Sequence, residues 1–295
     1  MSSMSATVTA DSLPTISVIV PVLNAASTLV RCVASLIHQD YPADRVEWIV
    51  VDNGSDDGSI EIARAVNEVR CLQERRPGAY AARNAGAAIA TGDILAFTDP
   101  DCVVEAGWLR AIAQTFEDPT CFVALGVRRP APDVGWNRLL GDYEVAKDEW
   151  MLSCGNPLKY YGFTNTMAMR RTVWEQCGPF DDRPRGADTI FVRRVVDVAG
   201  CASVRWEPGM RVSHLEMDGP TTYFKKAYTY GRSLQSYGRV VPVSPLTFRE
   251  RLTVYRMAVR MNRVNLIRAS QLLVLLAAGT AAWSAGRVAG FCRRK

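Results

Sequence analysis

The 295-residue sequence lacks the glycine-rich signatures by which two large enzyme classes hold phosphate groups. It contains no Gly-x-Gly-x-x-Gly, the turn that seats a dinucleotide at the start of a helix. It also contains no Gly-x-x-x-x-Gly-Lys followed by Ser or Thr, the loop that wraps the phosphates of ATP or GTP. These absences argue against a dinucleotide-dependent oxidoreductase and against a P-loop phosphotransferase.

Cysteine pairs, strong charge and an N-terminal leader pattern are also missing. The eight cysteines form no Cys-x-x-Cys and no cluster, which is typical of free thiols in a reducing compartment, so we expect a cytoplasmic catalytic domain. The net charge of +5 is mild, and no nucleic-acid partner is expected. Residues 1–15 carry no basic side chain and no apolar core, so we expect a loose tail over 1–14 rather than a signal peptide.

The first half of the chain alternates short apolar runs with helical patterns. Ile16–Val20 and Trp48–Val51 are typical of buried strands, Val69–Gln73 of a third, and Ile94–Phe97 of a fourth. Helical segments with short connections lie between them, the clearest over 79–90. This order predicts an α/β fold whose mainly parallel sheet is flanked by helices, as in a Rossmann-like nucleotide-binding half.

Two carboxylates follow the fourth strand, in Phe97-Thr98-Asp99-Pro100-Asp101. In an extended chain residues i and i+2 point to the same side, so Asp99 and Asp101 would face one spot. Paired carboxylates suit Mg²⁺ or Mn²⁺, which commonly bridge to the phosphates of a bound nucleotide. Taken alone, the triplet is weak evidence, and two solvated acids in a turn after a strand would be the favoured interpretation.

The second half offers weaker candidates. Asp188 lies where a helix is expected to begin, and on spacing alone an N-cap aspartate without a catalytic role is favoured. His214 follows a strand-like segment, and a lone histidine is more often structural than a metal ligand. The segment 221–238 is rich in tyrosine and basic residues, and it suits either a solvated helix or a cationic cover over phosphates.

The C-terminal segment 269–286 is uncharged and just long enough to be considered as a membrane span. Basic residues flank both of its ends, which favours a segment lying in the membrane interface or re-entering over a simple span. A core helix of a soluble protein is the alternative. We therefore expect residues 219–295 to form C-terminal helices associated with a membrane surface.

Several motifs in order resemble glycosyltransferase family 2, the inverting nucleotide-sugar enzymes of the GT-A fold. The matching stretches are Val18–Asn24, Val50–Ser59, Ala82–Gly86, Gly92–Asp101 and Gly186–Arg194, within a resemblance that covers roughly residues 14–235. The combination is specific, although each motif alone is not. It divides the chain into a donor-binding half over 15–127 and an acceptor-binding half with the catalytic base over 128–218.

The resemblance implies a role for each matching residue. Asp52 would read the nucleotide base, Asp99 would approach the ribose, and Pro21, Asn24 and Arg83 would belong to the same donor site. Asp101 would hold Mn²⁺ or Mg²⁺ against the diphosphate, with Asp99 and His214 as further candidate ligands. Asp188 would be the general base.

The implied reaction is transfer of a sugar from a nucleotide sugar, a UDP-sugar first, to a hydroxyl of a sugar or lipid-linked acceptor, in the synthesis of cell-surface glycans or glycolipids. The family usually has Glu-Asp where this chain has Ala187-Asp188, which puts one acceptor contact in doubt. No Gln-x-x-Arg-Trp follows His214, so a single addition is favoured over processive synthesis. The alternatives are a nucleotidyltransferase and a non-catalytic nucleotide-sugar-binding protein.

Overall fold

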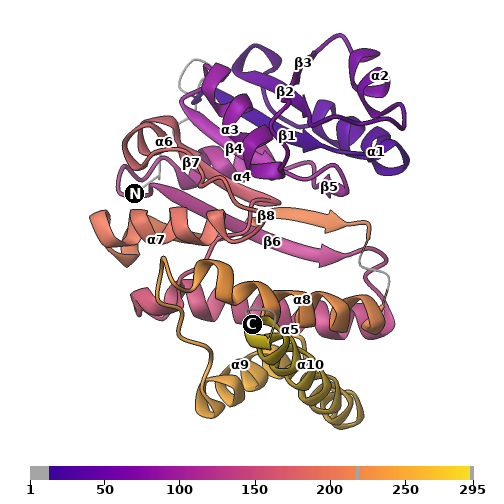
Figure 1. Cartoon of the computed structure of the whole chain (residues 1–295), viewed down its shortest axis with the longest axis vertical. Coiled ribbons are helices and arrows are strands. Elements are labelled where there is room, and N and C mark those ends of the chain that lie inside the picture. The colour runs from indigo at the N-terminus through magenta and orange to yellow at the C-terminus, as the bar shows by residue number, and fades with distance from the viewer. Residues whose placement is uncertain (1–12, 217–218, 293–295) are drawn as a thin grey trace, which may run out of the picture.

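The centre of the molecule is one eight-stranded sheet with the strand order β3-β2-β1-β4-β7-β6-β8-β5 (Figure 1). The computed structural model describes residues 13–216 and 219–292, so all but the last two positions of the expected N-terminal tail lie outside the described residues. The strands are β1 (Ile16–Val22), β2 (Val46–Asp52), β3 (Val69–Gln73), β4 (Ile94–Thr98), β5 (Cys102–Val104), β6 (Val123–Pro130), β7 (Thr166–Arg170) and β8 (Val204–His214).

Helices cover both faces of the sheet. The apolar cluster on one face takes side chains from α1 (Ala26–Ile37), α2 (Ser59–Arg64) and α4 (Trp108–Thr115), and the cluster on the other takes them from α3 (Ala79–Ile89), α6 (Arg171–Cys177) and α7 (Ala187–Ala199). Single 3-10 turns lie at Ala43–Arg45, Pro157–Lys159 and Cys201–Ser203. The predicted α/β fold, with its sheet flanked by helices, is confirmed.

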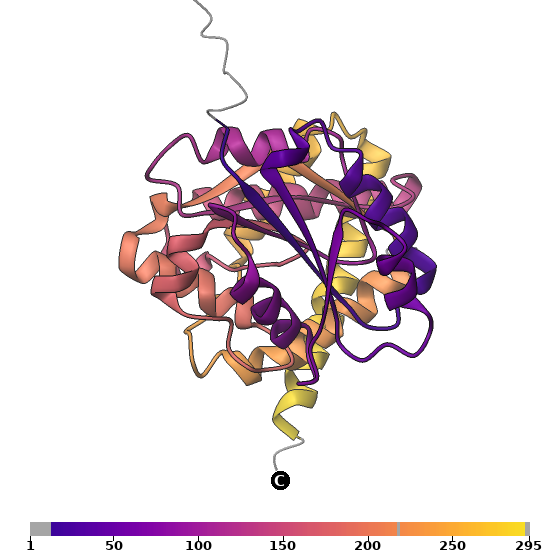
Figure 2. The same ribbon diagram turned by 90° about the horizontal axis from the view of Figure 1, so that it is seen from above.

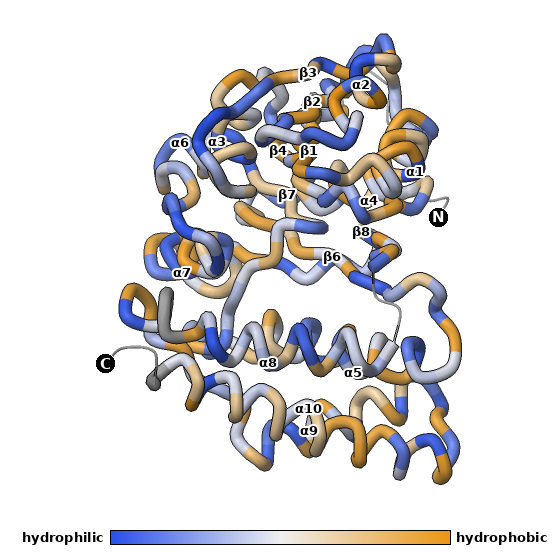
Figure 3. The backbone as a smooth tube through the Cα atoms, turned by 45° about the vertical axis from the view of Figure 1, so that its right-hand side comes forward, coloured by the Kyte–Doolittle hydropathy of each residue, from blue (hydrophilic) through white to orange (hydrophobic). Residues whose placement is uncertain are grey.

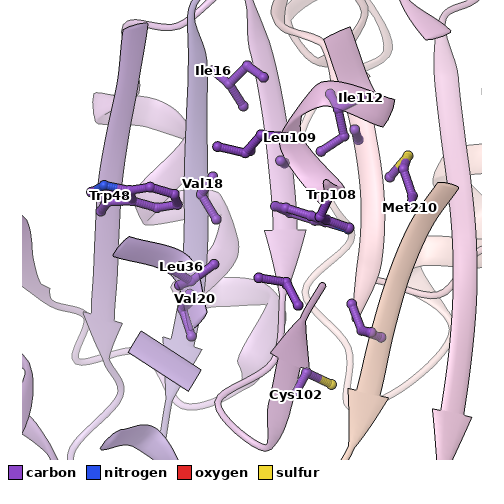
Figure 4. Close-up of a cluster of buried hydrophobic side chains, with 14 of the residues drawn as sticks. Ile16, Val18, Val20, Leu36, Trp48, Cys102, Trp108, Leu109, Ile112 and Met210 are labelled. Atoms are coloured by element: carbon purple, nitrogen blue, oxygen red, sulfur yellow. The ribbon is translucent and has the colours of Figure 1, made fainter. Parts of the chain in front are cut away.

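The continuous apolar runs of the central strands are explained by burial on both faces. Ile16, Val18 and Val20 of β1 point into one cluster, while Ile19 between them points into the other. Figure 4 shows the first cluster, where the Trp108 side chain of α4 lies fully buried beside the strands. The apolar side chains of this core hold the strand ends, and the loops that follow them, in fixed positions.

β1, β2, β3 and β4 are parallel, so their carboxyl ends meet at one edge of the sheet. β1 runs on through Pro21, where the sequence suggested that it would end. The pairing of β1 with β4 stops at Ile19, and from there β1 continues beside β2 alone. A proline, which has no N–H to donate, is tolerated where one side of a strand is unpaired.

The second half of the chain adds strands to the same sheet. β7 enters antiparallel between β4 and β6, and β8 runs parallel to β6. β8 is a single strand of eleven residues, and its register against β6 shifts between Gly126 and Val127. The division at 127/128 falls inside β6, so the two halves share a sheet and the division stays a prediction about binding roles.

Below the sheet lies a layer of four helices, α5 (Gly135–Ser153), α8 (Pro220–Tyr237), α9 (Phe248–Met261) and α10 (Leu266–Cys292), which Figure 3 shows from a second side. A third, smaller apolar cluster joins α5, α9 and α10. The predicted C-terminal helical extension is therefore confirmed. The end of α10 projects beyond the rest of the molecule (Figure 2).

Candidate active site

The loops after β1 and β2 are tied to each other at the carboxyl edge of the sheet. Asn24 lies in the first loop with φ +49°, and its side-chain oxygen accepts a hydrogen bond from the N–H of Asp56 at 3.0 Å. Asp52, only 2% exposed, accepts hydrogen bonds from the N–H groups of Gly54 and Ser55 within its own loop. These bonds fix the shape of the edge at which the resemblance places the nucleotide base.

Asn53 connects this edge to helix α3. Its amide nitrogen donates to the carbonyl oxygens of Glu74 and Arg76, at 2.8 and 2.7 Å, and its amide oxygen accepts from the N–H of Gly78 at 2.7 Å. Gly78 immediately precedes α3, so Asn53 links the carboxyl end of β2 to the start of the helix that carries Arg83.

Arg83 forms an ion pair with Asp99 at the end of β4. The arginine is 5% exposed, and its planar guanidinium can hold a carboxylate in one orientation. The Nε of Arg83 is buried and has no hydrogen-bond partner. A buried donor without a partner therefore lies on the same side chain that pairs with Asp99.

Next to Asp99 lies a row of three polar side chains, in which His214 stands between Asp101 and Lys226. The Nδ1 of His214, at the end of β8, lies 3.4 Å from a carboxylate oxygen of Asp101, and its Nε2 lies 3.3 Å from the Nζ of Lys226 on α8. Burial raises the pKa of Asp101, and the nearby charge of Asp99 raises it further. Burial and then the charge of Lys226 lower the pKa of His214 to about 4, so its imidazole is neutral at neutral pH.

The donor set of this row fits a divalent cation. Carboxylate oxygens and a neutral imidazole are the ligands that Mn²⁺ accepts, and the buried Nδ1 of His214 has no hydrogen-bond partner. Within the described residues no group of three or more acidic, histidine or cysteine side chains closes around one point. The few ligands that Asp101 and His214 offer would leave other coordination positions of a bound cation open. Phosphate oxygens and water can fill these positions, since such hard cations ordinarily keep water ligands in proteins.

Asp188 lies in the first turn of α7, where Gly186 is the N-cap residue, so the N-cap interpretation is wrong. Its carboxylate accepts a hydrogen bond from the N–H of Thr189 at 2.8 Å and one from the Tyr80 hydroxyl of α3. Burial raises its pKa despite these bonds and the nearby Arg83. Gly162 passes so close that a Cβ there would collide with the Asp188 backbone, which fixes the start of α7 against the neighbouring loop.

A cavity of about 670 Å³ joins these groups. Its walls come from the sheet edge, α3, α5, α7 and the C-terminal helices, and they include four of the predicted site residues: Arg83, Asp99, Asp188 and His214. Asp101 does not line the cavity, but one of its carboxylate oxygens lies 3.4 Å from the Nδ1 of His214. Pro21 and Asp52 lie at the carboxyl ends of β1 and β2, Asn24 lies in the loop after β1, and all three are outside the cavity lining. The candidate base and the candidate metal ligands therefore flank one space.

Three further cavity residues were not singled out from the sequence. Tyr80 hydrogen-bonds to Asp188. Because it lies three residues before Arg83 on the same helix face, the sequence could have indicated that it belongs to the same site. Lys226 was only one of several basic residues in its segment. Asn165 is 9% exposed, and its side-chain oxygen is buried without a hydrogen-bond partner. Asn165 is the residue just before β7, one step beyond the ladder pair Thr98–Thr166 and thus opposite Asp99.

Ion pairs between partly exposed arginines and buried aspartates brace the cavity wall formed by α5. Arg128 pairs with Asp148 at 2.7 Å and stacks over the ring of Phe163, and Arg129 pairs with Asp142 at 2.5 Å. Removing the arginine of such a pair is strongly destabilising, because the charge of the aspartate stays buried. These pairs hold α5 against the end of β6.

Comparison with known proteins agrees with this arrangement. Glycosyl transferase family 2 matches residues 17–178, more than half of the chain. Glycosyltransferase AglE of Haloferax volcanii is 34% identical over 195 residues, which is 63% of each chain. Glycosyltransferase GlyG of Streptococcus pneumoniae is 36% identical over 116 residues, 38% of each chain. The matched region thus spans less than two thirds of either relative.

Solved structures show the same fold. The mannosyltransferase PcManGT from Pyrobaculum calidifontis, in complex with GDP-Man and Mn²⁺, superposes with a TM-score of 0.65 at 19% identity, covering 96% of this chain and 88% of that one. S. aureus TarS 1-349 in complex with UDP-GlcNAc gives 0.55 at 16% identity, covering 91% and 81%. The expected GT-A fold is confirmed. The chain belongs to glycosyl transferase family 2.

Proposed function

We propose that this glycosyltransferase moves a sugar from a nucleoside-diphosphate sugar to an acceptor hydroxyl with inversion at the anomeric carbon. The observation that carries the proposal is the position of Asp188, which faces the same cavity as Asp99, Arg83 and His214. A reaction of this kind needs a base on one side of the transferred sugar and a diphosphate site on the other. The cavity provides candidates for both.

Asp101 and His214 would hold Mn²⁺ or Mg²⁺, with Asp99 as a further candidate ligand, and Lys226 would donate to the diphosphate. When bound, the metal ion would neutralise negative charge that develops on the departing nucleoside diphosphate. Lys226 makes no ion pair with a carboxylate among the described residues, and its ammonium is directed at His214, so a phosphate oxygen is a suitable partner. A UDP-sugar is the first donor to test, and GDP-mannose the second.

Asp188 would take the proton of the acceptor hydroxyl as that oxygen forms a bond to the anomeric carbon. Its raised pKa makes it a stronger base than an ordinary aspartate, and the Tyr80 hydroxyl orients the carboxylate. Attack on the face opposite the diphosphate inverts the centre, so an α-linked donor gives a β-glycoside. Ala187 is fully buried and offers no second carboxylate to the acceptor.

Asn165 would contact the transferred sugar. Asn165 lines the cavity opposite Asp99, one step beyond the β4–β7 ladder, and its side-chain oxygen is buried without a hydrogen-bond partner. A buried acceptor of this kind is costly to leave without a donor. A sugar hydroxyl is a donor of the right size for this place. Asn165 would then help to determine which sugar is accepted.

The reaction would take place on the cytoplasmic side of a membrane with which the C-terminal helices associate, since nucleotide sugars are used there. The product would be a cell-surface glycan or a glycolipid, built on a sugar or lipid-linked acceptor. Family membership favours this reaction over nucleotidyl transfer, and a transfer assay separates it from non-catalytic binding.

The test is a panel of nucleotide sugars screened by thermal shift with and without Mn²⁺, followed by transfer assays with the donors that stabilise the protein. The Asp101→Ala variant should lose the Mn²⁺-dependent part of nucleoside-diphosphate binding, while the control Asp44→Ala, at an exposed 3-10 turn, should keep it. Unchanged Mn²⁺-dependent affinity in Asp101→Ala would refute the metal assignment. Failure of every nucleotide sugar to bind the unaltered protein would refute the function.

A further inference from the structure

Helix α10 has an outer face that nothing in the described chain covers. Over Leu266–Gly290 it is long and apolar enough to cross a membrane, yet only 17% of its most apolar stretch is buried. Large apolar side chains along this face are exposed: Leu266 by 89%, Ile267 by 71% and Val274 by 70%. An exposed apolar surface of this extent marks an interaction site.

The opposite face of α10 packs against α8, the helix that carries Lys226 to His214. A Cβ at Gly286 would collide with the carbonyl oxygen of Tyr228 on α8, and one at Gly231 of α8 would collide with the carbonyl oxygen of Trp283, so the two backbones are in contact. Leu276 and Thr280 also line the cavity. α10 is therefore an outer surface and a cavity wall at the same time.

This packing is incompatible with a transmembrane orientation. α8 runs beside α10 and carries Lys225, Lys226 and Arg232, of which Lys226 reaches His214. If α10 crossed a bilayer, these charges and the polar cavity would be drawn toward the hydrocarbon, where each charge is costly. A helix lying in the membrane plane avoids that cost, because only its outer face enters the lipid.

The charge of this region identifies the kind of lipid. Between Phe248 and Gly290 the sequence holds seven arginines and a single acid, Glu250, which pairs with Lys159. Five of the arginines are exposed, and all five lie on α9 or close to the start of α10: Arg249, Arg256, Arg260, Arg263 and Arg268. Exposed basic side chains on α9, which packs against α10, and at the start of α10 match the negative headgroups of an anionic leaflet.

We propose that α9 and α10 dock in the plane of an anionic lipid surface, with the outer face of α10 in the headgroup region and the exposed arginines on the phosphates. The proposal deepens the membrane association given above by naming the face, the orientation and the lipid charge. Vesicle binding needs neither donor nor acceptor, so its failure is distinguishable from a failure of the proposed transferase activity.

The experiment is co-sedimentation of the full chain with vesicles of phosphatidylcholine alone and of phosphatidylcholine with one third phosphatidylglycerol. We expect tight binding to the anionic vesicles at low salt, weaker binding at high salt, and release by alkaline carbonate, which does not extract a spanning helix. Equal recovery in the supernatant with both vesicle types would overturn the proposal. Retention after carbonate would overturn the in-plane orientation.

Surface variants test the face. Leu273→Ser combined with Val274→Ser should weaken vesicle binding roughly tenfold, and each of Arg256→Ala and Arg260→Ala should weaken it about fivefold. The matched control is Val198→Ser, at an 80% exposed valine near the end of α7, which should bind as the unaltered protein does. Unchanged unfolding temperatures show that the variants are folded. Equal loss of binding in the control, or none in the α10 variant, would refute the assignment of the face.

Discussion

Replacing Asp188 by asparagine should remove most sugar transfer and, at the same time, make the folded protein more stable at neutral pH. Asparagine keeps an oxygen that can accept from the Thr189 N–H and the Tyr80 hydroxyl, so the local geometry is retained. It cannot take a proton from the acceptor. Loss of a positioned general base typically costs about 10²–10⁴-fold in rate.

The gain in stability follows from the sign of the pKa shift. Burial raises the pKa of Asp188 in the folded protein above its unfolded value, so the folded state disfavours the ionised carboxylate. The resulting penalty is absent below the unfolded pKa and fully present above the folded pKa. Each unit of the rise corresponds to about 1.4 kcal/mol in the free energy of unfolding, and each kcal/mol shifts Tm by about 2 °C in a domain of this size.

The assay pairs transfer kinetics with thermal unfolding at two pH values, one at about pH 4, close to the unfolded pKa of an aspartate, and one at about pH 8. The Tm advantage of Asp188→Asn should be larger at the higher pH, and transfer by the unaltered enzyme should fall as the pH falls through the raised pKa. The control is Asp197→Asn, an exposed acid of the same helix, which should change neither quantity. Near-normal transfer by Asp188→Asn, or a lower Tm at the higher pH, would contradict the assignment of Asp188 as a buried base.

Three further substitutions probe the rest of the site and the helices beside it. Asn165→Ala should weaken binding of the intact nucleotide sugar, measured by calorimetry, and leave the nucleoside diphosphate unaffected; equal weakening of both would place Asn165 elsewhere. Lys226→Ala should weaken the binding of the nucleotide sugar and of the nucleoside diphosphate by about tenfold, because a charge-assisted hydrogen bond is lost. Lys225→Ala, at the exposed neighbouring residue, should leave both affinities unchanged. Gly286→Leu should destabilise the fold by about 1–3 kcal/mol or more in a denaturant titration, because its side chain would meet the α8 backbone, while Ala285→Leu on the outer face should be nearly neutral.

The donor half follows closely from the sequence because its signals are local. The strand Val69–Gln73 lies where its pattern predicts it, and α3 ends one residue before its predicted end. β5 and α6 were not predicted. β5 has only three residues and is formed by pairing with β8, which lies more than a hundred residues further along the chain. A strand stabilised by so distant a partner leaves no periodicity of its own.

The candidate site divides in the same way. Asp99 and Asp101 became candidates as paired acids after a strand, but their roles, like that of Asp188, needed the family resemblance, because the local patterns alone favoured solvated acids and a helix cap. The hydrogen bond from Tyr80 to Asp188 and the ladder position of Asn165 opposite Asp99 join residues far apart in sequence. In the sequence Asn53 resembles an ordinary turn residue, although its side chain makes hydrogen bonds to three backbone groups of the loop between β3 and α3.

The backbone contact between α8 and α10 makes α8 a direct structural connection between the outer surface of α10 and the candidate active site. One side of α8 touches α10 through Gly231, and another side carries Lys226 to His214. Where two backbones are in contact, side-chain rotation cannot compensate for a small displacement of α10. Such a displacement would therefore move α8, and with it the ammonium of Lys226 beside the imidazole of His214. Detergents and short-chain alcohols that bind to the outer face of α10 should therefore change the affinity for the nucleoside diphosphate without entering the cavity.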